Sequence, residues 1–243
     1  MSTRVTEVER KYEANDSASA FDPSTLAQLT GTSGRRRTHD HRLTAVYYDT
    51  EDLALLGSGM TLRRREGGED PGWHLKVPTG KDTRIETRLP LDDSAGDVPA
   101  ELRSLVRATV RHANLVAVAR IDTDRTLHRW TDETGAPIID VMVDRVSAND
   151  LRSRGAMRHR TEVEVELGSG GHELLAKIES RLTVVGLRRS ITSTKLAKAL
   201  DWTAPSTTAA RRAGSTGRQT RPVASTGCQR NQSTIDYSSA CDH

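Results

Sequence analysis

Charged and aliphatic residues alternate along several short segments of this 243-residue chain, and the alternation constrains the fold more than any other feature. The first segment is EVERKYE, in which Glu7, Glu9, Lys11 and Glu13 occupy every second position. Because successive side chains of a β-strand point to opposite faces, this spacing predicts a strand with one charged face. That face contains acids and a lysine, so its surroundings must satisfy both signs of charge.

The same alternation recurs along the chain and predicts further strands. In all, strands are expected at 5–13, 43–48, 60–66, 73–77, 83–89, 116–129, 137–146 and 160–167. Aliphatic residues at helical spacing predict helices at 23–29, 98–113, 172–185 and 193–200. Helices between mostly short, alternating strands are typical of an α+β fold.

Strands of this kind can form two arrangements. In an open antiparallel sheet, one face packs on the core and the other faces water, which would solvate the charges. In a closed barrel, the charged faces would point inward and helices would cover the aliphatic faces. Arginines cluster on middle strands, as in Arg63 and Arg65, whereas paired acids mark the first and last strands, as in Glu162 and Glu164. This sorting of the charges favours the barrel.

A charged interior limits what such a barrel can hold, because buried charges need partners. The arginine guanidinium matches the geometry of phosphate oxygens. Mg²⁺ and Mn²⁺ prefer carboxylate and water oxygens. The expected guest is therefore a polyanion that a divalent cation bridges to the carboxylates.

The order of the motifs resembles the CYTH domain family, the triphosphate tunnel metalloenzymes. EVERK, at Glu7–Lys11, matches the ExExK signature of that family, and LRRR, LKVP, RIETRL, EVEVEL and STKLAKAL follow in order. The resemblance extends over nearly all of residues 3–201. It implies an antiparallel, eight-stranded β-barrel tunnel with a charged lumen and flanking helices.

The resemblance also implies a role for individual residues. The expected metal-binding carboxylates are Glu7, Glu9, Glu162 and Glu164, with Asp144 as a further ligand and Asp140 as a weaker one. The expected substrate-binding cations are Lys11, Arg63, Arg65, Lys76, Arg84, Arg125 and Lys195. Of these two sets, Glu9, Lys11, Arg63 and Arg65 are the expected catalytic residues.

Two questions of position stay open at this point, and two further expectations belong with them. Arg120 competes with Arg125 for the inward face of its strand, because an odd spacing puts the two on opposite faces. Glu86 would orient the cations around it, and Glu166 belongs either inside the barrel or at its rim. His39 and His41 follow an arginine-rich segment and are expected on a solvated loop.

The activity that the resemblance implies is the hydrolysis of a triphosphate with Mg²⁺ or Mn²⁺ as cofactor. Inorganic tripolyphosphate is the favoured substrate and thiamine triphosphate the second. Two alternatives remain: a class IV-type adenylate cyclase and a non-catalytic module that binds polyphosphate or nucleotides. A homodimer is left open.

Composition adds limits on partners and domains. The chain has 36 basic and 33 acidic residues, and the excess of three lies entirely after residue 203, which argues against a nucleic-acid partner. Both cysteines, Cys228 and Cys241, lie in this last part, so residues 1–203 have no cysteine for a disulfide or a zinc site.

Residues 1–203 are expected to form the triphosphate-binding domain. Residues 204–243 are expected to be a disordered tail rich in Ser, Thr and Arg, left by an interrupted CHAD-type helical domain. Without a long apolar run, a cytoplasmic protein without membrane contact is expected.

Overall fold

The computed structural model describes residues 1–14, 22–26, 36–91, 97–153, 155–190 and 194–202. Contacts between Cα atoms divide the chain into Met1–Ala204 and Pro205–His243, and all described residues belong to the first unit. The tail expected at 204–243 lies outside the described residues, as does the end of the helix expected at 23–29.

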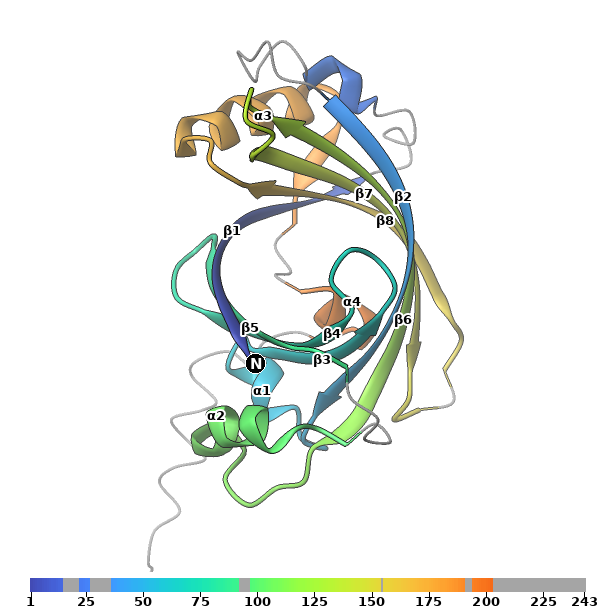
Figure 1. Ribbon diagram of the computed structural model, residues 1–243. Helices are drawn as coiled ribbons and strands as arrows, with labels where there is room; N and C mark the ends of the chain where they lie inside the picture. Colours follow the sequence, from blue (N-terminus) through green and yellow to red (C-terminus); the bar gives the residue numbers. More distant parts are fainter. Residues whose placement is uncertain (15–21, 27–35, 92–96, 154, 191–193, 203–243) are drawn as a thin grey trace, which may run out of the picture. The chain divides into compact units, whose positions relative to one another are not determined.

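Eight antiparallel strands close into a barrel (Figure 1). The sheet runs in the order β5-β4-β3-β2-β6-β7-β8-β1, and β5 also pairs with β1, which closes the ring. The short β9 pairs with β1 beside the barrel. The predicted eight-stranded antiparallel barrel is confirmed. The strands are β1 (Thr3–Ala14), β2 (Arg36–Asp49), β3 (Thr61–Glu66), β4 (Gly72–Pro78), β5 (Thr83–Leu89), β6 (Val116–Thr131), β7 (Pro137–Asp150), β8 (Arg158–Leu167) and β9 (Leu187–Arg189).

Helices cover the outer, aliphatic faces of the strands, as the alternation requires. Helix α3 packs through Leu175 and Ile178 on a cluster that includes Val163 and Val165 of β8. Helices α1 and α2 cover β3 and β4 around the buried Trp73. No helix among the described residues is both long and apolar enough to span a lipid bilayer. The helices are η2 (Pro23–Leu26, a 3₁₀ helix), α1 (Ala54–Gly57), α2 (Ala100–Val110), α3 (His172–Val184) and α4 (Lys195–Ala199).

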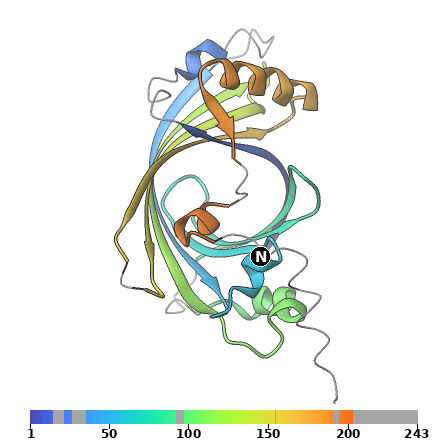
Figure 2. The ribbon, with the colours of Figure 1, turned by 180° about the vertical axis from the view of Figure 1, so that it is seen from behind.

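Helix α4 lies against one end of the barrel (Figures 1 and 2). Its Leu196 belongs to an apolar cluster with Ile121 of β6 and Val146 of β7, which lie on the inward faces of their strands. The Thr194 hydroxyl caps the helix by accepting a hydrogen bond from the Ala197 amide at 3.0 Å. This packing places Lys195, the first residue of α4, next to the charged part of the lumen.

Candidate active site

A cavity of about 240 Å³ lies inside the barrel. All eight barrel strands, helix α4 and the connection between β3 and β4 contribute to its wall. Eleven of the thirteen residues predicted for the site line it: Glu7, Glu9, Lys11, Arg63, Arg65, Lys76, Arg84, Arg125, Asp140, Glu164 and Lys195. The other two, Asp144 and Glu162, lie behind the wall and are almost completely buried.

Three cations converge on the carboxylate of Glu164. The Nζ atoms of Lys11 and Lys195 each lie 2.6 Å from it, and Arg125 donates to it at 2.9 Å. Arg125 also forms two parallel hydrogen bonds of 2.7 Å with Asp144, the bidentate geometry that arginine favours with carboxylates. Lys195 contacts Asp144 as well, at 2.8 Å. The part of the lumen near α4 therefore brings three cations together around two carboxylates.

The β1 acids are held by cations from two other strands. Arg84 of β5 donates to Glu9 at 2.6 Å, and Lys11 lies 3.4 Å from the same carboxylate. Lys76 of β4 forms an ion pair with Glu7 and lies 4.0 Å from Glu9. Each acid of the EVERK segment thus has a basic partner on β4 or β5.

Burial and charge act against each other on these carboxylates. Burial tends to raise the pKa of Glu9, but the charges of Lys11 and Lys76 outweigh it and lower the pKa to about 2. The pKa of Glu162 is likewise lowered to about 2, because Lys195 and nearby cations outweigh the effect of burial. Both groups are carboxylates at neutral pH.

Glu166 is in the opposite situation. Burial raises its pKa to about 7, and the nearby charge of Lys76 only partly offsets this while Glu7 and Glu9 add to it. Across the β7–β8 ladder Glu166 lies directly opposite Asp140, a second acid. Its side chain lines the cavity, which answers the open question of its position: it is inside the barrel.

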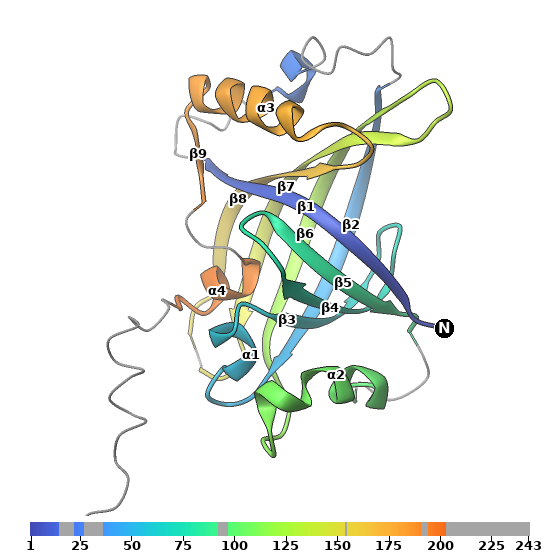
Figure 3. The same ribbon diagram turned by 90° about the vertical axis from the view of Figure 1, so that its left-hand side faces the viewer.

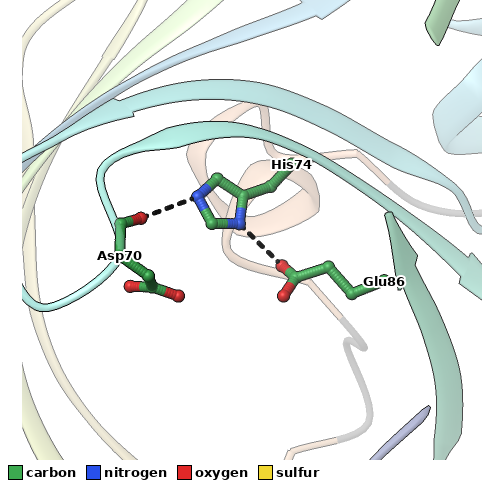
Figure 4. A group of neighbouring side chains, drawn as sticks. All are labelled: Asp70, His74 and Glu86. Carbon is green, nitrogen blue, oxygen red and sulfur yellow. Dashed lines mark hydrogen bonds and ion pairs between the residues drawn. The ribbon is translucent and has the colours of Figure 1, made fainter. Parts of the chain in front are cut away.

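No three of the six predicted metal ligands have carboxylate oxygens within 4.8 Å of one another among the described residues, and Lys11 and Lys195 lie between several of these carboxylates. The one described group of three ligand atoms within 4.8 Å of one another belongs to Asp70, His74 and Glu86 (Figure 4). Both ring nitrogens of this His74 already have partners. Nδ1 lies 3.0 Å from Glu86, and Nε2 lies 3.0 Å from the backbone oxygen of Asp70.

The strand parity of β6 separates the two competing arginines. Arg125 lines the cavity, whereas Arg120 is exposed on the other face and pairs only with Asp122 among the described residues. The predicted loop position of His39 and His41 was wrong. Both residues lie in β2, and His41 lines the cavity.

The site also includes residues to which the sequence reasoning gave no role. The alternation of a strand could have found three of them, because each lies an even number of positions from a predicted residue and so shares its face. These are Arg88 (with Glu86), His74 (with Lys76) and Arg129 (with Arg125). Asp70 lies on the β3–β4 connection, where no periodicity operates, so the sequence carries no signal for it. Figure 4 shows Asp70 and Glu86 on either side of the His74 ring.

Comparison with known proteins identifies chains that are similar to this one in sequence and in fold. The CYTH domain family matches residues 6–199. Two proteins of uncharacterised function, from two strains of Mycobacterium tuberculosis, are each 35% identical over 212 residues, an alignment that covers 82% of this chain and 41% of theirs. The chain therefore spans less than half the length of these curated relatives. A crystal structure of a candidate adenylate cyclase from Bacillus halodurans has the same fold, with a TM-score of 0.53 at 18% identity, and the match covers 80% of this chain and 97% of that chain.

Proposed function

This chain belongs to the CYTH domain family, and on that premise we propose that it hydrolyses a triphosphate inside its barrel with the help of a divalent cation. The observation that carries the proposal is the mixed charge of the cavity. Lysines and arginines from β1, β3, β4, β5, β6 and α4 face the carboxylates of β1 and β8 across one lumen. Such a lumen suits an anion that is held by cations on one side and linked to acids through a metal on the other.

The proposed phosphate ligands are the cations that now hold carboxylates. They are Lys11, Arg63, Arg65, Lys76, Arg84, Arg125 and Lys195. A phosphoryl group beside Glu164 would meet three of them, since Lys11, Arg125 and Lys195 all contact that carboxylate. Their charges are fixed in place by the surrounding ion pairs, so little reorganisation is needed when the substrate binds.

The proposed metal ligands are Glu7, Glu9, Asp144, Glu162 and Glu164. All are hard oxygen donors, the class that Mg²⁺ and Mn²⁺ prefer. Glu162 fits this role because its Oε2 atom is buried without a hydrogen-bond donor among the described residues, although Lys195 Nζ lies 3.2 Å away. Bound by these residues, the ion would supply positive charge next to the transferring phosphoryl group and acidify a water molecule.

In the proposed reaction a water molecule attacks the terminal phosphorus and the bond to the bridging oxygen breaks. Lys11, Arg63 and Arg65 stabilise the charge that develops on the phosphoryl oxygens, and Glu9 holds Lys11 and Arg84 in position. With tripolyphosphate the products are orthophosphate and pyrophosphate. No covalent intermediate with the protein is required.

Inorganic tripolyphosphate is the first proposed substrate and thiamine triphosphate the second. A cavity of about 240 Å³ with a largely charged wall suits a compact anion. An adenylate cyclase would direct a ribose oxygen at the α-phosphate and would need further room for a nucleoside. This makes cyclisation the less favoured reaction.

The test is a panel of phosphate-release assays with tripolyphosphate, thiamine triphosphate and ATP, each with Mg²⁺, Mn²⁺ or a chelator. We expect release to be fastest from tripolyphosphate and to stop with the chelator. Tight binding of tripolyphosphate in calorimetry without any release would contradict hydrolysis and indicate a binding module. Formation of cyclic AMP and pyrophosphate from ATP would contradict it in favour of a cyclase.

A further inference from the structure

The β3–β4 loop, residues 67–71, places two carboxylates in the wall of the cavity. Glu69 lies 3.1 Å from Arg129, and Asp70 forms an ion pair with Arg65 and lies 3.4 Å from Arg88. Both acids line the cavity. They contact cations of the lumen in the way that phosphate oxygens would.

The loop is held firmly in this position. Gly67 and Gly68 both have positive φ angles, +78° and +76°, and a Cβ atom on Gly67 would lie 2.1 Å from the backbone oxygen of Arg42. The backbone oxygen of Asp70 accepts a hydrogen bond from Arg65 at 3.0 Å and lies 3.0 Å from the ring of His74 (Figure 4). The carboxylates of the loop are therefore fixed parts of the site.

The loop and α4 contact opposite ends of the lumen. Along β6, Ile121 packs with α4, Arg125 lies in the centre and Arg129 contacts the loop. Eight residues of a strand span roughly 26 Å, so the two contacts are far apart. Figure 3 shows the barrel from the side, with α4 near one end of β6.

Cations and carboxylates are shared differently at these two ends. Near α4, Lys11, Arg125 and Lys195 converge on Glu164, and Arg125 and Lys195 also contact Asp144. Near the loop, Arg88 contacts the three carboxylates of Glu7, Glu86 and Asp70, and Lys76 also contacts the first two.

Arg129, another arginine at the loop end, is also shared between acids. Its partners are Glu69 and Asp140, the second of which it contacts at 2.8 Å. Glu166 lies opposite Asp140 in the sheet, and two like charges in such a cross-strand pair repel each other. Near the loop, an anion would thus meet the four acids Glu69, Asp70, Asp140 and Glu166 around the arginines.

We infer that Glu69 and Asp70 are specificity-determining residues that exclude phosphate chains longer than a triphosphate from the site. This inference rests on the proposed function. A triphosphate bound at Lys11, Arg125 and Lys195 fills the part of the lumen near α4. Further phosphates of a longer chain would extend toward the loop carboxylates that already occupy Arg88 and Arg129.

The test compares the wild-type protein with the variant Glu69→Gln/Asp70→Asn, both as full chains with Mg²⁺. The inhibition constant of long-chain polyphosphate is measured against the KM for tripolyphosphate. Removing two like charges should lower the ratio of the two constants by on the order of tenfold. Glu66→Gln is the matched control, because this acid directly precedes the loop, is exposed and contacts Arg64 rather than the cavity.

An unchanged ratio in the double variant would overturn the inference, even if both constants fell in parallel. A parallel fall would mean that the loop only competes with every anion for the arginines. Calorimetric binding of both anions gives the same ratio without turnover, so the loop can be tested even if the wild-type protein releases no phosphate. Circular dichroism and melting curves verify that both variants fold.

Discussion

The two parallel hydrogen bonds from Arg125 to Asp144 need the planar fork of a guanidinium. Replacing Arg125 by lysine keeps a positive charge but loses the parallel hydrogen bonds to Asp144. We expect kcat/KM for tripolyphosphate to fall on the order of 100-fold, as it does when one preorganised donor is lost from an active site. The melting temperature should change little, because Lys195 still neutralises Asp144 at 2.8 Å.

Arg120→Lys is the control for this change on the same strand. Arg120 is exposed and pairs with Asp122 at 3.2 Å, outside the cavity. Its substitution should leave turnover unchanged. Equal losses in the two variants would contradict the assignment of Arg125 to the substrate.

At the level of single residues, strand parity explains both the successes and the gaps of prediction. Parity placed Glu9, Lys11 and Arg63 on one interior face, since the period of a strand fixes which side chains share a face. It could not find Asp70, whose position depends on the positive φ angles of two loop glycines and on a hydrogen bond from Arg65. Contacts made by a loop depend on tertiary packing and leave no periodic trace.

Helix α1 is an element that the sequence pattern did not predict. It has only four residues, too few for a helical period to be visible. Its first amides are instead held by the buried Asp49, whose carboxylate accepts hydrogen bonds from Leu55 at 2.8 Å and from Leu56 at 2.9 Å. Hydrogen bonds to a carboxylate at the end of β2 thus stabilise this short helix, which its own sequence does not indicate.

Asp49→Asn should weaken this contact, because an amide nitrogen would face a backbone N–H that now donates to an oxygen. The expected loss is about 1–3 kcal/mol in the free energy of unfolding, measured with urea. Asp52→Asn is a nearby control, since Asp52 is exposed and bonds only the Thr50 hydroxyl among the described residues. A loss as large in the control would mean that charge alone matters in this segment.

Strand lengths were underestimated for a related reason. The pattern predicted a strand from residue 43, but β2 begins at Arg36. Most of the added residues are exposed, so no alternation of burial marks them. They are strand because β6 pairs with them, as in the Arg37–Arg129 and His39–Leu127 positions of the ladder. Pairing between distant segments cannot be deduced from a local pattern.

The interior of the whole barrel is an ion network, and the network makes stability depend on pH. The pKa values of Glu9 and Glu162 are about 2 in the fold, against 4.5 ordinarily. Below pH 4.5 the unfolded chain binds protons that the folded chain does not. Folding stability should therefore fall as pH drops from 4.5 toward 2, which urea unfolding at several pH values in a chelator would measure. Constant stability over this range would contradict the network.

Glu166 should act in the opposite direction at higher pH. Its pKa of about 7 in the fold exceeds the ordinary 4.5, so the folded state binds the extra proton between these two values. Its contribution to stability is complete below pH 4.5 and is lost as pH rises through 7. His74 opposes this trend, because burial lowers its pKa to about 4 and acidification from 6.5 then favours unfolding. The two effects overlap in pH, so a curve of unfolding free energy against pH for the wild type does not isolate either group.

A difference between two proteins does isolate Glu166. Glutamine resembles the protonated acid, so Glu166→Gln should unfold with the same free energy as the wild type near pH 4.5. At pH 8 the wild type must keep a charged carboxylate opposite Asp140, and the variant should be the more stable of the two. His74 and all other groups are common to both proteins and cancel in the difference. A difference that stays constant from pH 4.5 to pH 8, measured in urea with a chelator, would mean that Glu166 is not held between acids in the lumen.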